Sequence, residues 1–196
     1  ANRVGPIPVK VKSAASANTT TEKPSPKAPL RPYIEKGEDT LKFIKAPEGC
    51  KLEFIASEKE FPELVNPVQM NFDTRGRLWV AVWPNYPETT PTTKVFDKLL
   101  VFDIDPKTGR FTKCTTFADG LNCPTGFQLY KDGVLVMQSP DMWFLRDTDG
   151  DGKADWKERV VHGLDAADSH HETNSICYEP GGAVYFSDGV FHRTNV

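Results

Sequence analysis

The sequence contains no run of about 18 apolar residues, so no segment is expected to cross a membrane as a helix. Its longest apolar stretch, residues 78–83, has the length of a β-strand. There is no starting Met, and no apolar segment of the signal-peptide type lies near Ala1. A mature chain whose signal has been removed would look like this, and so would an internal fragment.

Cysteine is scarce, and its spacing excludes two kinds of site. The four cysteines form no C-x-x-C pair, which argues against a zinc ribbon, and no C-x-x-C-H, so no c-type haem is attached within this chain. Cys114 and Cys123 flank a turn-like stretch and would be in range for a disulfide if the neighbouring strand ends meet. The alternative is four free, mostly buried thiols.

Familiar catalytic motifs are also absent. The sequence has no G-x-S-x-G elbow, no G-x-G-x-x-G after a strand and no Walker loop. No window of twelve residues shows a helical stripe of apolar residues, so we expect an all-β chain.

Charge is divided unevenly along the chain, whose formal net charge is −3. Residues 1–36 carry seven Lys or Arg against two Glu, so the remainder is acidic. An acidic body does not attract phosphates, and we therefore expect no nucleic acid partner.

Residues 1–38 are predicted to be an extended tail. The stretch 13–21 is rich in Ser, Thr and Ala, and four prolines follow between residues 24 and 32. Such a segment cannot bury enough apolar surface to offset its conformational entropy. We expect it to lie along the rest of a larger protein or along a partner subunit.

From residue 39 onward the pattern is that of short strands. Residues 51–56 alternate polar and apolar side chains, as a half-buried strand does. Further strand candidates are separated by Gly, Pro and Asp clusters. They are residues 78–82, 98–102, 111–117, 134–137, 143–146, 158–161 and 183–186.

A three-copy repeat indicates which all-β architecture is present. Segments 71–82, 128–139 and 177–188 each join an apolar residue, a turn with Gly and a strand, which aligns Gly76, Gly133 and Gly182. Repeats of this size are typical of propeller blades. We expect residues 39–196 to form a partial β-propeller of about three blades, whose ring is completed by missing sequence or by another polypeptide chain.

Residues 147–158 predict a calcium site, because they match D-x-[DN]-x-[DN]-G-x5-E at every specified position. Calcium takes six to eight oxygen ligands, which a tight acidic loop supplies. The expected ligands are the side chains of Asp147, Asp149, Asp151, Asp155 (directly or through water) and Glu158, and the backbone carbonyl of Lys153. Strands flank the loop, which favours a structural ion on a hairpin over a sensor; the alternative is a solvated acidic hairpin.

Three stretches together resemble one protein family. They are residues 66–80, the acidic loop with residues 145–146 before it, and residues 169–192, which includes Ser169-His-His-Glu-Thr-Asn174. The chain resembles the N-terminal propeller of planctomycete membrane-bound dehydrogenases, also called PVC-type haem-binding proteins.

The resemblance implies a six-bladed-type propeller similar to soluble quinoprotein sugar and sorbosone dehydrogenases, with pyrroloquinoline quinone as cofactor. It also implies a cytochrome c domain or partner, and a periplasmic, cell-envelope or secreted location. In the matching first loop, residues 103–109, a proline is inserted among the acids, and no ion is expected there.

His170 and His171 are the candidate catalytic residues. In quinoprotein propellers a His takes the substrate hydroxyl proton before hydride passes to the quinone, and these two precede a strand in a comparable place. The alternative is a polar loop His without chemistry. No Lys or Arg cluster suited to the carboxylates of a quinone is evident in the sequence.

The functional hypothesis from the sequence is a dehydrogenase-like oxidoreductase that acts on a sugar or alcohol. One alternative is a non-catalytic, calcium-stabilised scaffold or binding module. A propeller hydrolase or lyase acting on polysaccharide is a third possibility, since fold does not fix function.

Overall fold

The computed structural model describes residue 34 and residues 36–87, 92, 94–168, 171–190 and 193–196. The predicted tail, residues 1–38, lies outside these ranges except for residues 34 and 36–38. A short helix α1 (Gly37–Thr40) and a 3-10 turn η1 (Leu41–Phe43) begin the continuous part of the described chain. In the described part of the chain, no helix is long and apolar enough to cross a membrane.

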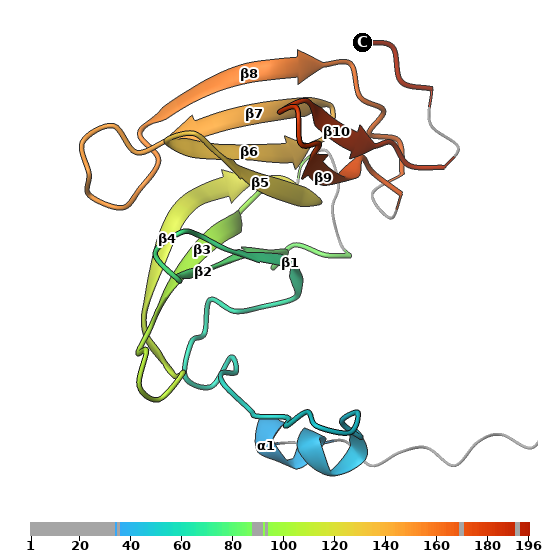
Figure 1. The fold of residues 1–196 in the computed structure, drawn as a ribbon. Helices are drawn as coiled ribbons and strands as arrows, with labels where there is room; N and C mark the ends of the chain where they lie inside the picture. The colour runs from blue at the N-terminus through green and yellow to red at the C-terminus, as the bar shows by residue number, and fades with distance from the viewer. Residues whose placement is uncertain (1–33, 35, 88–91, 93, 169–170, 191–192) are drawn as a thin grey trace, which may run out of the picture. The chain divides into compact units, whose positions relative to one another are not determined.

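The first blade is a four-stranded antiparallel sheet in the order β1-β2-β3-β4 (Figure 1). Its strands are β1 (Pro67–Phe72), β2 (Leu78–Val82), β3 (Asp97–Ile104) and β4 (Phe111–Leu121). All five residues of β2 are buried, because both faces of this apolar strand are covered.

The second blade repeats this topology. Its strands are β5 (Gly126–Tyr130), β6 (Gly133–Gln138), β7 (Asp141–Arg146) and β8 (Trp156–His162), again hydrogen-bonded in sequence order. A third sheet pairs β9 (Asn174–Tyr178) with β10 (Val184–Ser187) and is called blade 3 below. The described chain is thus all-β, with consecutive antiparallel sheets of the partial-propeller kind, as the sequence predicts.

The repeat marks one equivalent hairpin in each blade. Gly76 lies between β1 and β2, Gly133 begins β6, and Gly182 lies between β9 and β10. Gly76 and Gly182 have φ of 78° and 92°, which favours glycine. Gly133 is needed for a different reason, since a Cβ there would come within 2.3 Å of the Leu145 carbonyl oxygen.

The main core lies between blades 1 and 2. Trp79, Leu99 and Phe117 of blade 1 pack in one buried cluster with Phe127 and Leu145 of blade 2. The opposite face of blade 1 has its own cluster, which Phe61 and Leu64 of the preceding turn partly cover. A third cluster joins Met137 and Met142 of blade 2 to Ile176 of blade 3.

The first strands of the three blades lie next to one another, because β5 contacts both β1 and β9. The Gln69 side chain bridges the first two: its Nε2 donates to the Phe127 carbonyl at 3.0 Å, and its Oε1 accepts from the Phe127 N–H at 2.5 Å. The Tyr178 hydroxyl donates to the Leu129 carbonyl at 2.8 Å. Side chains thus take the place of ladder bonds between blades.

The sequence prediction was wrong for residues 51–56, which form no strand. Alternation shows only that a segment suits a half-buried sheet surface, whereas a strand also needs a neighbouring edge to pair with. Leu52 and Ile55 remain exposed. The first strand of each blade was missed, since β1, β5 and β9 were not among the strand candidates.

None of the four cysteines forms a disulfide, so the expected Cys114–Cys123 bridge is absent from the structure. Only Cys123 is buried, which also corrects the expectation of mostly buried thiols. Burial, with the nearby Glu63 carboxylate, raises the pKa of Cys114 to about 11. This thiol therefore stays protonated at neutral pH.

Candidate functional site

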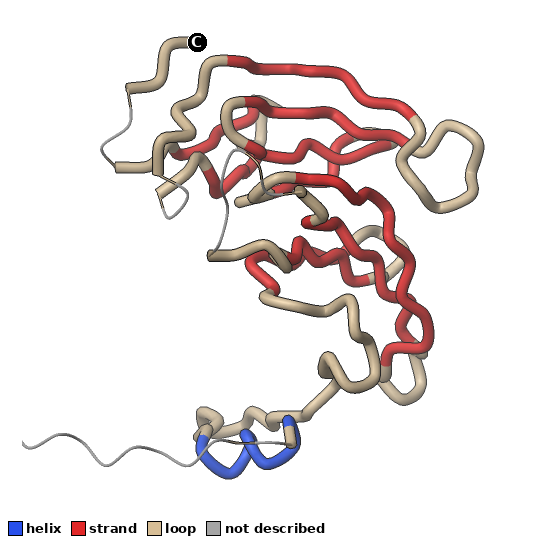
Figure 2. Tube along the Cα trace, turned by 180° about the vertical axis from the view of Figure 1, so that it is seen from behind, coloured by secondary structure: helices blue, strands red, loops and turns tan. Residues whose placement is uncertain are grey.

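The acidic loop, residues 147–155, connects β7 to β8 at one end of blade 2. It is the large tan loop at the upper right of Figure 2. One carboxylate oxygen from each of Asp147, Asp149 and Asp151 lies within 4.8 Å of the others. Three carboxylates held this close repel one another, and a divalent cation would offset that repulsion.

Backbone hydrogen bonds fix these three carboxylates. Asp147 accepts the Gly150 N–H at 2.7 Å and the Gly152 N–H at 2.9 Å. Asp149 accepts the Asp151 N–H at 3.2 Å, and Asp151 accepts the Lys153 N–H at 2.8 Å. Gly150 and Gly152 have φ of 82° and 90°, so the turn requires glycine at both positions.

The other predicted ligands lie outside this triplet. Asp155 accepts the Thr148 N–H at 2.8 Å and the Thr148 hydroxyl at 2.6 Å, and these bonds hold its pKa below the usual value. Glu158 lies on β8 opposite Phe144, two residues beyond the last strand pair before the loop, Arg146 with Trp156. Lys153 follows the triplet, and its N–H bonds back to Asp151.

The acidic loop also connects blade 2 to blade 1. The Ala154 N–H donates to the Phe117 carbonyl of β4 at 2.7 Å, and the Ala154 side chain packs against the core between the two blades. Packing against this core therefore explains why a small residue, Ala154, stands at this position. Fixing the loop also fixes its connection to the neighbouring blade.

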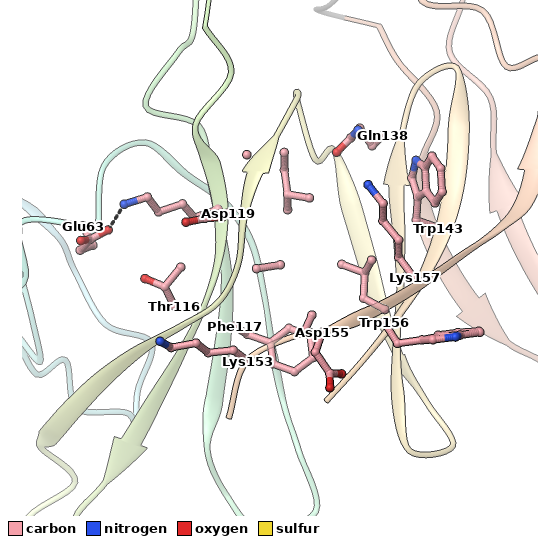
Figure 3. Close-up of a pocket in the computed structure, with 16 residues that line it drawn as sticks. Glu63, Thr116, Phe117, Asp119, Gln138, Trp143, Lys153, Asp155, Trp156 and Lys157 are labelled. Atoms are coloured by element: carbon pink, nitrogen blue, oxygen red, sulfur yellow. Dashed lines mark hydrogen bonds and ion pairs between the residues drawn. The ribbon is translucent and has the colours of Figure 1, made fainter. Parts of the chain in front are cut away.

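A groove of about 640 Å³ lies between β4 and the two strands that the acidic loop joins, β7 and β8 (Figure 3). Lys157 lies beside the Trp143 ring, 5.1 Å from its centroid, and Lys98 is ion-paired with Glu63. We call this groove the rim groove, and the described residues that line it do not include His171.

His171 pairs with an acid in the loop before β9. Its Nδ1 lies 2.7 Å from Asp168 Oδ2, and both side chains are partly exposed. Because an ionised carboxylate only accepts, this nitrogen carries the proton, which leaves Nε2 as the basic atom of the neutral ring. The other candidate, His170, lies outside the described residues.

Glu172 is a buried acid that the sequence reasoning missed. The residue is only 4% exposed, and its Oε2 has no hydrogen-bond partner among the described residues. Burial, and secondly the charge of Asp168, raise the pKa of Glu172 to about 8. It is therefore neutral at pH 7, and strongly shifted acids of this kind are frequent at functional sites.

Glu172 lines a cavity of about 620 Å³, called the inner cavity below. The cavity lies where β1, β5 and β9 begin, so all three blades contribute to it. Its lining includes Gln69, Trp83, Tyr86, Thr125, Glu172 and Asn174. Nothing in the sequence pattern marks Glu172 as buried, although it stands within the stretch Ser169–Asn174 that carries the family resemblance.

A family model described as "Domain of unknown function (DUF7133)" matches residues 36–196. No curated protein and no solved structure matches the chain.

Proposed function

The chain belongs to the DUF7133 family over residues 36–196, and from its geometry we propose that it is the N-terminal propeller portion of a dehydrogenase-like oxidoreductase. The proposed substrate is a sugar or alcohol, and the proposed location is outside the cytoplasm. The observation that carries this proposal is the His171–Asp168 pair, placed directly before the buried Glu172.

His171 would act as the general base. The Asp168 carboxylate orients the ring and stabilises the imidazolium that forms when Nε2 accepts a proton from a substrate hydroxyl. This proton transfer prepares the alcohol carbon to lose hydride. The proton would thus move from the substrate hydroxyl to Nε2 of His171.

Pyrroloquinoline quinone, suggested by the family resemblance, does not fit the inner cavity. This quinone carries three carboxylates, and among the described residues no Lys or Arg lines the cavity to pair with them. We therefore derive no step through a quinone. A two-electron cofactor held elsewhere in the assembly would accept the hydride, and a haem-bearing domain would then take the electrons from it one at a time.

Calcium is the proposed structural ion of the acidic loop. Asp147, Asp149 and Asp151 would hold it, with Asp155, Glu158 and the Lys153 carbonyl as the further ligands that the sequence predicts. The hard carboxylate oxygens suit calcium, and the ion would offset their mutual repulsion. Its position on a hairpin that bonds to blade 1 supports a structural role.

A non-catalytic scaffold is the second candidate, and one observation favours it. Met70 and Phe72 on β1 and Tyr185 on β10 are large, apolar and more than half exposed. Large apolar side chains grouped on sheet faces mark surfaces that another element covers. Such faces suit further blades or a partner chain.

The test is metal analysis and a dye-reduction assay on the natively purified protein, with sugars and sugar alcohols as substrates. The proposal expects stoichiometric calcium and substrate-dependent dye reduction. His171→Gln should lower kcat at least about a hundredfold, because general-base catalysis contributes roughly that much. His162→Gln, on β8, is the matched control and should leave kcat unchanged.

Calcium without any dye reduction would replace the oxidoreductase proposal with the scaffold. Absence of calcium after gentle purification would overturn the structural ion.

A further inference from the structure

Two buried polar atoms at the inner cavity have no hydrogen-bond partner in the described part of the chain. They are Glu172 Oε2 and the indole Nε1 of Trp83, on residues that are 4% and 7% exposed. Buried polar groups are nearly always hydrogen-bonded, and each one left unpaired costs about 1–3 kcal/mol. Both residues line one cavity, so a single bound molecule could reach both side chains.

The inner cavity has the composition of a small-molecule site. Its volume of about 620 Å³ lies in the usual range for ligand pockets. The rings of Trp83 and Tyr86, whose centroids are 5.6 Å apart, supply an aromatic wall. Gln69, Asn174 and Ser175 add polar side chains to the lining. Bonds to Phe127, Glu172 and Asn174 hold these side chains in place.

The charges near the cavity select against ions. In the part of the chain that the structure describes, no Lys or Arg lines the cavity, so an anionic ligand would find no cationic partner there. The Asp168 carboxylate adds negative charge close to Glu172. The donors and acceptors instead match hydroxyl groups, each of which both donates and accepts, and the aromatic wall matches the C–H face of a ring or chain.

We propose that the inner cavity binds a neutral polyhydroxylated compound, a sugar or sugar alcohol, whose hydroxyls pair with Glu172 and Trp83. The substrate class rests on the proposed function, but the binding itself requires neither turnover nor a redox cofactor. Three blades contribute to the site: Trp83 follows β2, Thr125 precedes β5 and Glu172 precedes β9.

The experiment is isothermal titration calorimetry of the full-length, calcium-loaded protein at pH 6.5, with glucose and sorbitol as probes. We expect saturable one-to-one binding of at least one probe. Trp83→Phe keeps the ring but removes the N–H donor, and Glu172→Leu removes both carboxyl oxygens. Each should weaken binding about tenfold or more, since an unmatched substrate hydroxyl loses a hydrogen bond in a buried site.

Two further variants separate a binding role from a structural one. Glu172→Gln keeps a neutral group that donates and accepts, and should bind the probe within about threefold of wild type. Trp143→Phe removes the unpartnered indole N–H of the rim groove and should not change binding. Glu172→Leu should also unfold at a higher denaturant concentration, because it removes an unpaired buried group.

The inference would be overturned if no probe bound saturably, or if Trp83→Phe and Glu172→Leu left binding intact. It would also be overturned if glucuronate bound more tightly than glucose, or if Glu172→Gln alone lost its calcium ion. Binding with no dye reduction would overturn only the proposed function. Dye reduction without Glu172-dependent binding would overturn only this inference.

Discussion

Asp97, at the start of β3, holds two separate loops with one buried carboxylate. Its Oδ1 accepts the Asn85 N–H at 3.0 Å, and its Oδ2 accepts the Cys123 N–H at 2.9 Å. Burial raises the pKa of Asp97, although these two bonds act in the opposite direction. The carboxylate therefore stabilises the fold by pairing donors that would otherwise be buried and unsatisfied.

Replacing Asp97 should destabilise the chain strongly. Asp97→Ala leaves two buried N–H groups without an acceptor and should lower the free energy of unfolding by about 2–4 kcal/mol. Urea denaturation followed by circular dichroism measures this. Asp119→Ala, on an exposed position of β4, is the control and should shift the free energy by less than about 0.5 kcal/mol. Equal effects would refute the assigned role of Asp97.

Glu172 should make stability depend on pH in an unusual direction. Its pKa is about 8 in the folded chain against 4.5 for an ordinary Glu, so between these values the folded state binds more protons than the unfolded state. Stability contributed by the protonated form is therefore lost as pH rises from about 4.5 to 8, by up to about 1.4 kcal/mol per pH unit.

The comparison of wild type with Glu172→Gln isolates this effect, because the other titrating groups are shared. The difference in unfolding free energy between the two proteins should change steadily over that window and level off above pH 8. A difference that stays constant from pH 5 to 9 would show that the Glu172 pKa is not raised.

The acidic loop is the element whose stability should depend most on calcium. With free calcium at about 100 times its Kd, the ion should add about 2.7 kcal/mol to the free energy of unfolding. Asp149→Ala should abolish this increment, measured as the difference between calcium-loaded and chelator-treated protein.

Asp105→Ala provides a matched control for the loop. Asp105 lies in the corresponding turn of blade 1 and accepts the N–H of Lys107 two residues on, as Asp149 accepts that of Asp151. The two substitutions thus remove the same local bond. If Asp105→Ala removed the calcium increment as completely as Asp149→Ala, the ion would not be specific to the loop between β7 and β8.

Sequence and structure agree best at the elements whose pattern is local. The Gly76, Gly133 and Gly182 repeat predicts one hairpin per blade because turn geometry depends on adjacent residues. The position of Glu158 does not follow from the loop motif in the same way. In paired helical hands a helix follows the loop and carries that Glu, whereas here Glu158 stands on β8, two residues beyond the Arg146–Trp156 pair.

At the scale of the whole molecule, the sequence could not predict the contacts between segments that are distant in the chain. Glu172 is buried at a cavity that residues of all three blades line, and alternation along one segment carries no information on that. Residues 51–56 show the reverse, since their pattern suits a strand but the fold offers no edge. His171 was found from the sequence, but its Asp168 partner was not.

Blades 1 and 2 should unfold as one unit, because they share a core. Leu145 of β7 lies in the cluster that contains Trp79 and Phe117 of blade 1. Leu145→Ala should lower the free energy of unfolding by about 2–5 kcal/mol. Single-Trp variants that retain only Trp79 or only Trp156 should report the same denaturation midpoint; separate midpoints would mean that each blade is stable alone.

The hydrogen bond from Ala154 to the Phe117 carbonyl has a thermodynamic consequence. Since the segment that would hold the ion is also the segment that contacts the preceding blade, ion uptake and blade docking are reciprocally linked. Whatever factor the ion contributes to docking, docking must contribute equally to ion affinity. The affinity for calcium would then measure how completely two blades have assembled, and a chain whose blades are only partly joined would hold the ion more weakly.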